Sequence, residues 1–213
     1  MSGHETQPIS TAGKPLAEAN AALILLHGRG ATAESMLPLA DAVGAEGFAV
    51  LAPQAQGYQW YSQRFTAPKE QNEPSLTSAL RTVEKLVQQA NEAGIPTERV
   101  VIGGFSQGAC LTSEFAAQHP TRYGGLLVFS GGLIGEDAAV SAEAYKGSLE
   151  GTPVFLGCSD VDAHIPLERV QETTRILKSL GADVTEKIYP GMAHTVNEDE
   201  LEQARKIIEG VTR

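Results

Sequence analysis

The sequence has few of the features that mark disulfide-stabilised or membrane proteins. Only two of its 213 residues are cysteines, Cys110 and Cys158, and neither belongs to a CxxC motif or a Cys/His cluster. No stretch approaches the roughly 18 consecutive apolar residues of a membrane helix, and no signal peptide is recognisable at the N-terminus. We therefore expect two reduced, partly buried thiols, no metal site and a cytoplasmic protein.

Basic residues are also scarce. Lysine and arginine number 16 against 26 aspartates and glutamates, so the formal net charge is −10. This charge repels nucleic-acid phosphates and anionic membrane surfaces at long range. With 42% hydrophobic and 20% charged residues, the composition is that of a globular protein. We expect a small-molecule partner and neither nucleic acid nor membrane, while a homodimer stays open.

Apolar runs of strand length recur along the chain. They are Ala22–Leu26, Phe48–Leu51, Val100–Ile102, Leu126–Phe129, Val154–Leu156 and Val184–Tyr189. Most are continuous rather than alternating, which is typical of parallel strands buried on both faces.

Amphipathic helical patterns lie between these runs. The apolar faces comprise Leu76, Leu80, Val83, Val87 and Ala90; Leu167, Val170, Thr174 and Leu177; and Leu201, Ala204 and Ile208. Asn197 and Glu200 have the spacing of a capping box at the start of the last helix. The alternation predicts a doubly wound α/β fold with a mostly parallel sheet, helices on both faces and no large cap domain. We expect one domain over residues 1–213, with residues 1–20 as an edge segment in which Met1–Pro15 adds a short antiparallel hairpin.

A candidate nucleophile lies between a predicted strand and a predicted helix. The segment Val100–Ala109 contains the pattern Gly-x-Ser-x-Gly, formed by Gly104, Ser106 and Gly108. The five-residue pattern alone is common, but on a strand-to-helix turn it projects the serine hydroxyl above the sheet, and the glycines prevent backbone clashes. The free N–H groups of the following helix would stabilise a developing oxyanion. The context therefore favours Ser106 as a catalytic serine over an ordinary Gly/Ser-rich loop.

A serine nucleophile needs a base and an acid that orients the base. His194 follows the last predicted strand and is the best candidate base. His119 at a helix end, His4 in an untethered tail and His27, which precedes Ser106 and suits loop shaping, fit less well.

The acid should follow a strand between Ser106 and His194. Asp160 and Asp162 both follow the predicted strand Val154–Leu156. The order serine, aspartate, histidine is that of an α/β-hydrolase, but chemistry alone does not choose between the two aspartates.

The second oxyanion donor should come from the loop after an earlier strand. Gly28 and Gly30 flank Arg29, so the Arg29 amide can turn inward beside that of Gln107. A GxGxxG nucleotide-binding loop is the alternative, but the spacing after Gly30 breaks the pattern.

Four segments together resemble the phospholipase/carboxylesterase family of small α/β-hydrolases, which includes acyl-protein thioesterases. They are Leu25–Gly30, Gly104–Gly108, Asp162–Pro166 and Gly191–His194. In that family the catalytic acid lies four residues before a proline, a position that Asp162 holds before Pro166. The resemblance therefore favours Asp162 as the catalytic acid, with Ser106 and His194. Ala163 replaces the usual proline, however, and Asp160 has the family's other common spacing, so an Asp160 triad stays open.

The resemblance also implies a function. Trp60 and Tyr61 match an aromatic pair that lines the acyl pocket in the family, although packing within the loop explains a lone tryptophan equally well. We expect a serine carboxylesterase that needs no cofactor and acts on small or short-acyl esters. An acyl thioesterase or lysophospholipase using the same site is the first alternative, and a catalytically silent ligand-binding fold is the second.

Overall fold

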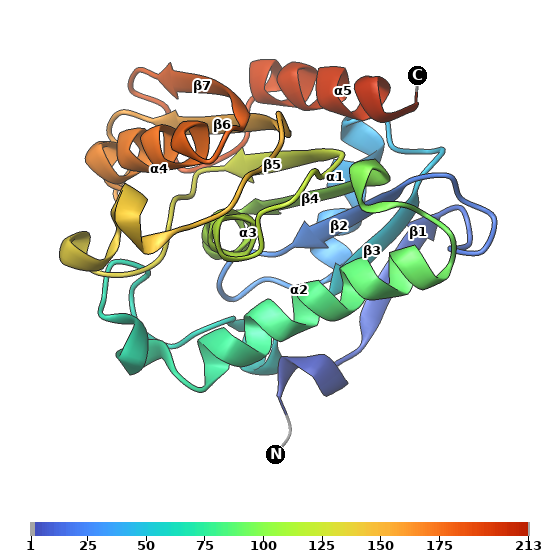
Figure 1. Cartoon of the computed structure of the whole chain (residues 1–213), viewed down its shortest axis with the longest axis horizontal. Coiled ribbons are helices and arrows are strands. Elements are labelled where there is room, and N and C mark those ends of the chain that lie inside the picture. The colour runs from blue at the N-terminus through green and yellow to red at the C-terminus, as the bar shows by residue number, and fades with distance from the viewer. Residues whose placement is uncertain (1–2, 213) are drawn as a thin grey trace.

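The computed structural model describes residues 3–212, which form one seven-stranded sheet between two layers of helices (Figure 1). Met1, Ser2 and Arg213 lie outside the described residues. The strands are β1 (Ile9–Gly13), β2 (Ala22–Leu26), β3 (Ala49–Pro53), β4 (Val100–Phe105), β5 (Gly125–Phe129), β6 (Pro153–Ser159) and β7 (Asp183–Tyr189). The α-helices are α1 (Leu37–Ala42), α2 (Ser75–Glu92), α3 (Gln107–Gln118), α4 (Leu167–Ser179) and α5 (Glu198–Thr212). Short 3-10 helices occur at His4–Thr6, Glu34–Met36, Gln56–Tyr58, Lys69–Asn72, Thr97–Arg99, Asp137–Ala139 and Ala142–Ala144.

The strand order is β1-β3-β2-β4-β5-β6-β7. Every neighbouring pair is parallel except β1 with β3. The chain moves outward from β2 first to β3 and then, in the other direction, through β4 to β7, which is a doubly wound arrangement. Each of the six apolar runs coincides with one parallel strand, although Phe48 lies one residue before β3, and every residue of β2, β3 and β5 is buried. The predicted fold class is therefore confirmed.

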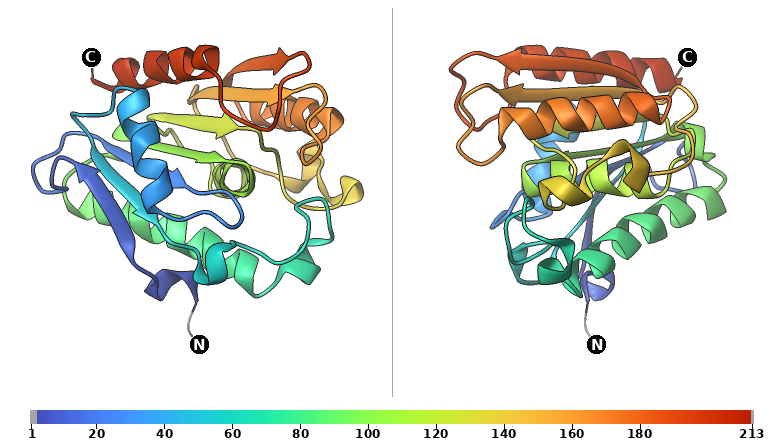
Figure 2. Two further views of the ribbon diagram at one scale, coloured as in Figure 1. Left: turned by 180° about the vertical axis from the view of Figure 1, so that it is seen from behind. Right: turned by 60° about the vertical axis from the view of Figure 1, so that its left-hand side comes forward.

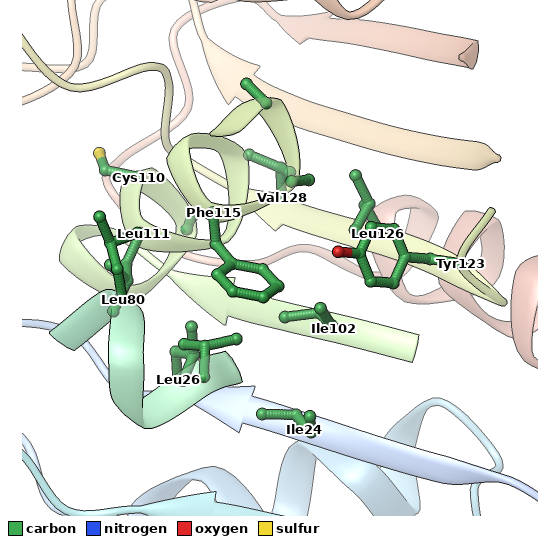
Figure 3. Packing of buried hydrophobic residues seen from close by; sticks show 14 of the residues in the cluster. Ile24, Leu26, Leu80, Ile102, Cys110, Leu111, Phe115, Tyr123, Leu126 and Val128 are labelled. Carbon is green, nitrogen blue, oxygen red and sulfur yellow. The ribbon is translucent and has the colours of Figure 1, made fainter. Parts of the chain in front are cut away.

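Alternate residues of β2 pack into different helical layers. Ile24 and Leu26 belong to the apolar cluster shared with α2, α3 and α4, whereas Leu23 and Leu25 belong to the cluster shared with α1 and α5. Figure 3 shows Phe115 of α3 in the first cluster, close to the strand residues. From behind, α1 and α5 are seen on the opposite face (Figure 2). Only Ser106 separates the end of β4 from the start of α3, so the first turn of this helix lies directly at the carboxyl end of β4.

The predicted N-terminal hairpin is wrong. The part of Met1–Pro15 that the structure describes contains one strand, β1, which pairs antiparallel with β3 along the edge of the main sheet. The residues before it form a 3-10 helix whose His4 is buried, so they cannot supply a second strand. Alternating exposed and half-buried residues in β1 fit an edge strand with one solvated face.

None of the helices within residues 3–212 has the length and apolar character that crossing a membrane requires.

Substitution of Gly108 tests the close packing of α3 against β2. A Cβ at Gly108 would overlap the backbone carbonyl oxygen of Leu26, which the sheet holds in place. We expect Gly108→Ala to lower the free energy of unfolding by about 1–3 kcal/mol, measured by urea denaturation. Gly210→Ala is the matched control, because a Cβ there meets no atom within 4 Å. This substitution within α5 should raise the free energy of unfolding by up to about 1 kcal/mol. Equal effects at the two glycines would contradict the packing argument.

Candidate functional site

Ser106 occupies the turn between β4 and α3 in a backbone conformation that is unusual for a residue with a side chain. Its φ is 55° and its ψ is −116°. A Cβ at Gly104 would overlap the backbone of Gly108, and a Cβ at Gly108 would overlap β2, so the turn requires both glycines. The surroundings therefore hold Ser106 in a strained conformation with its hydroxyl at the carboxyl edge of the sheet.

The structure brings Ser106, His194 and Asp162 together in one chain of hydrogen bonds. The Ser106 Oγ lies 2.9 Å from Nε2 of His194, and Nδ1 of His194 lies 2.6 Å from Oδ2 of Asp162. Each side chain follows a different parallel strand, β4, β7 or β6, and the carboxyl ends of these strands share one edge of the sheet. This is the geometry in which a histidine can take a proton from a serine while a carboxylate orients it.

The competing aspartate has a different task. Oδ1 of Asp160 accepts a hydrogen bond of 2.7 Å from the backbone N–H of Gly191, in the turn that leads to His194. Gly191 has a φ of 66°, in the left-handed region that favours glycine. The structure thus places Asp162 against the imidazole, whereas Asp160 anchors the turn that presents it.

The carboxylate of Asp162 is well supplied with donors. Oδ1 accepts from the backbone N–H groups of His164 and Ile165 at 2.8 and 3.1 Å, and the Cys158 thiol lies 3.8 Å from Oδ2. Burial opposes the charged form, but the hydrogen bonds from His194 and the two amides outweigh it and hold the pKa of Asp162 below its ordinary value. The group is therefore an anion at neutral pH.

The two predicted oxyanion donors border the same cavity as Ser106. Arg29 and Gln107 both line it, and no acceptor within residues 3–212 takes the backbone N–H of either residue. Gln107 is the first residue of α3, so the positive end of the helix dipole adds to the effect. The arrangement suits a negative oxygen that develops beside Ser106.

The cavity has a volume of about 560 Å³. It is lined by Gly28, Arg29, Ala31, Tyr61, Ser62, Gln63, Arg64, Phe65, Phe105, Ser106, Gln107, Cys110, His164, Ile165 and His194. This volume is within the range of small-molecule sites.

The predicted aromatic pair divides between core and cavity. Tyr61 lines the cavity, but Trp60 is fully buried, is not among the lining residues, and donates from Nε1 to the backbone carbonyl of His27 at 2.9 Å. The packing explanation therefore describes Trp60, whereas Tyr61 is a buried residue that borders the cavity.

The side chain of Gln107 fixes this loop. Its Oε1 accepts from the N–H of Trp60, and its Nε2 donates to the carbonyl of Tyr61, both at 2.8 Å. Gln107 was predicted only for its backbone N–H group. Its side chain also connects the start of α3 to the cavity wall.

The other histidines have structural contacts. The prediction that His4 lies in an untethered tail is wrong, since its Nδ1 accepts from the N–H of Gln56 and its Nε2 lies 3.0 Å from the carbonyl oxygen of Trp60. His27 accepts from the N–H of Ala55 and is fully buried, as expected for a residue that shapes a loop. His119 caps the end of α3.

Both cysteines are free and buried. Burial raises the pKa of each thiol to about 12, so neither is a thiolate at neutral pH. Among residues 3–212, no group of three histidine, cysteine or acidic side chains is arranged to hold a metal ion.

Several lining residues escaped the sequence analysis. They include Arg64, Phe65, Phe105, Cys110, His164 and Ile165. His164 and Ile165 lie two and three residues after Asp162, and Phe105 precedes Ser106, so their proximity to candidate site residues could have indicated them. Arg64 follows the Trp60–Tyr61 pair by three residues.

The family model for Phospholipase/Carboxylesterase matches residues 9–212. The chain belongs to the phospholipase/carboxylesterase family. The resemblance seen in the sequence is thereby confirmed, and the α/β-hydrolase fold with it.

Solved and curated relatives agree with this assignment. A phospholipase/carboxylesterase of Dyadobacter fermentans is 40% identical, with a TM-score of 0.92 over 98% of this chain and 99% of that one. Acyl-protein thioesterase 1 of Gibberella zeae is 32% identical over 58% of this chain and 52% of its own length. The chain therefore spans about half the length of the curated relatives it matches. SOBER1 of Arabidopsis thaliana, 23% identical with a TM-score of 0.76 over 92% of this chain and 100% of that one, shares the fold.

Conservative changes at the two aspartates separate their tasks. Asp162→Asn cannot hold His194 in the required tautomer, so we expect a fall in kcat of roughly 10³–10⁴-fold. Asp160→Asn keeps an oxygen that can accept the hydrogen bond from the Gly191 N–H, so it should lower kcat far less. Steady-state hydrolysis of a para-nitrophenyl ester by both variants measures the difference. A greater loss in Asp160→Asn would reverse the assignment.

The first turn of α5, the helix that follows His194, contains a buried acidic residue, Glu200. The N–H of Asn197 donates to Oε2 of Glu200 at 2.8 Å, and the N–H of Glu200 donates to Oδ1 of Asn197 at 3.0 Å, so the predicted capping box is confirmed. Oε1 of Glu200 is buried without a hydrogen-bond partner among the described residues. Burial, with a smaller contribution from Asp199, raises the pKa of Glu200 from 4.5 to about 7.

Glu200 should make stability fall as the pH rises. The folded state holds its proton more tightly than the unfolded state, so its contribution is complete below about pH 4.5 and is lost as the pH rises to about 7. Glu200→Gln keeps a capping oxygen and has no charge to bury. We expect it to reduce the difference in unfolding free energy between about pH 5 and about pH 8 by roughly 1–3 kcal/mol in urea titrations. An unchanged difference would contradict this account.

Proposed function

We propose that this protein is a serine carboxylesterase that hydrolyses small or short-acyl esters. The observation that supports it best is the continuous hydrogen-bonded chain from Ser106 through His194 to Asp162. The cavity beside it, of about 560 Å³, is within the range of small-molecule sites. No cofactor is needed for this chemistry.

The proposed reaction has two halves. Ser106 attacks the ester carbonyl while Nε2 of His194 takes its proton, and the resulting oxyanion binds the N–H groups of Arg29 and Gln107. His194 then returns the proton to the leaving alcohol, and an acyl group remains on Ser106. A water molecule, activated by the same histidine, releases the acid and restores the serine.

A thioesterase is the second candidate, because curated relatives from Gibberella zeae and Candida albicans are named acyl-protein thioesterase 1. A thiol leaving group needs no change in the site. Rates on matched acyl-thiol and acyl-phenol substrates distinguish the two. The free thiols of Cys110 and Cys158 fit a reducing compartment, and we propose the cytoplasm as the location.

Replacement of the nucleophile tests the proposal. We expect the protein to be labelled at Ser106 by a fluorophosphonate, and Ser106→Ala to lose both labelling and ester turnover, with kcat falling by roughly 10⁶-fold. Ser113→Ala is the matched control, since its buried hydroxyl bonds only to the backbone of α3. Undiminished hydrolysis by Ser106→Ala would refute the proposed function.

A further inference from the structure

The cavity beside Ser106 differs in charge from the rest of the protein. The whole chain has a formal net charge of −10. The cavity lining nevertheless includes two arginines, Arg29 and Arg64, and no aspartate or glutamate. The carboxylate nearest in the hydrogen-bond chain, Asp162, is already engaged by His194. A ligand in the cavity therefore meets positive charge that no lining residue neutralises.

Neither arginine forms an ion pair among residues 3–212. Arg29 donates from Nη1 to the Gln59 side chain and the carbonyl of Ser62, and from Nη2 to the carbonyl of Gln63. These acceptors are neutral oxygens, so they hold the guanidinium in place without cancelling its charge. Arg29 is thus a fixed positive charge at the cavity.

Arg64 has the opposite arrangement, with a fixed backbone and an unengaged side chain. Its carbonyl oxygen accepts from the Asn72 side chain at 3.2 Å and from the N–H of Ala67 at 3.1 Å. Its guanidinium is exposed and has no hydrogen-bond partner within residues 3–212. All of its donors are available to a ligand.

The segment around Arg64 is anchored at each step. Gln107 holds Trp60 and Tyr61, Arg29 holds Ser62 and Gln63, and the N–H of Gly135 donates to the carbonyl of Phe65 at 2.7 Å. Binding a ligand through Arg64 therefore orders one side chain and no backbone, which lowers its entropic cost.

We propose that the site prefers esters that carry a second, anionic group, a carboxylate or a phosphate, and that Arg64 binds this group while Arg29 contributes a fixed positive field. A guanidinium recognises both oxyanions through paired N–H donors. The inference rests on the proposed esterase function and defines its substrate class more narrowly.

Matched ester pairs test the preference. To place the charge on the leaving alcohol, para-acetoxybenzoate is compared with its methyl ester. Para-acetoxyphenyl phosphate carries a phosphate at the same position. On the acyl side, the monophenyl ester of adipic acid is compared with phenyl hexanoate. We expect the unaltered protein to have a higher kcat/KM on the charged member of at least one pair, through a lower KM. Added salt should reduce this advantage.

Variants at Arg64 then locate the preference. Arg64→Gln should lower the charged-to-neutral ratio of kcat/KM by about five- to tenfold, between the effect of an exposed ion pair and that of a charge-assisted hydrogen bond. Arg64→Lys should retain part of the ratio. Arg81→Gln is the matched control, because Arg81 is exposed on α2 and does not line the cavity. The ester whose kcat/KM falls more in Arg64→Gln, the carboxylate or the phosphate, identifies the anionic group that Arg64 binds.

Two results would overturn the inference while leaving the esterase proposal intact. One is equal turnover of charged and neutral members in both pairs by the unaltered protein. The other is a ratio that Arg64→Gln does not change. Failure of fluorophosphonate labelling together with no turnover of any ester would instead refute the proposed function, and this inference with it.

Discussion

The site depends on how closely the backbone of α3 approaches β2 and β4. Gly104 and Gly108 have no Cβ, and this lets the first turn of the helix lie against the strand ends. Ser106 sits between them with a positive φ that the surroundings enforce. This one approach sets the position of the Ser106 hydroxyl, the direction of the adjacent N–H groups and the contact with the cavity loop.

The parts predictable from the sequence were those encoded locally. Apolar runs of strand length, most of them continuous, identified every parallel strand, and the Gly-x-Ser-x-Gly pattern between strand and helix located the turn at Ser106. The choice between Asp160 and Asp162 could not be made from chemistry alone, because both follow the same strand and both carry a carboxylate. Only the three-dimensional path of the Gly191 turn shows that one aspartate binds the backbone and the other the imidazole.

Long-range partners explain what the sequence left unpredicted. His4 is buried because loop residues Gln56 and Trp60 come to it from more than fifty positions away. Glu114, buried in α3, similarly accepts from the Ile134 N–H and the Tyr145 hydroxyl, and pairs with Lys69. No periodicity or motif indicates contacts of this kind, since each joins residues far apart in the sequence whose relative positions are set by the whole fold.

The side chain of Gln107 has a consequence for how this site can vary. The same residue carries one of the two N–H groups proposed to bind the oxyanion, and its side-chain amide holds the loop at Trp60 and Tyr61. A change in the loop that alters the fit of a substrate will pull on that amide, and thereby on the helix end beside Ser106. If the reaction proceeds as proposed, Gln107 couples selectivity to chemical rate, and we expect substitutions that change one to disturb the other.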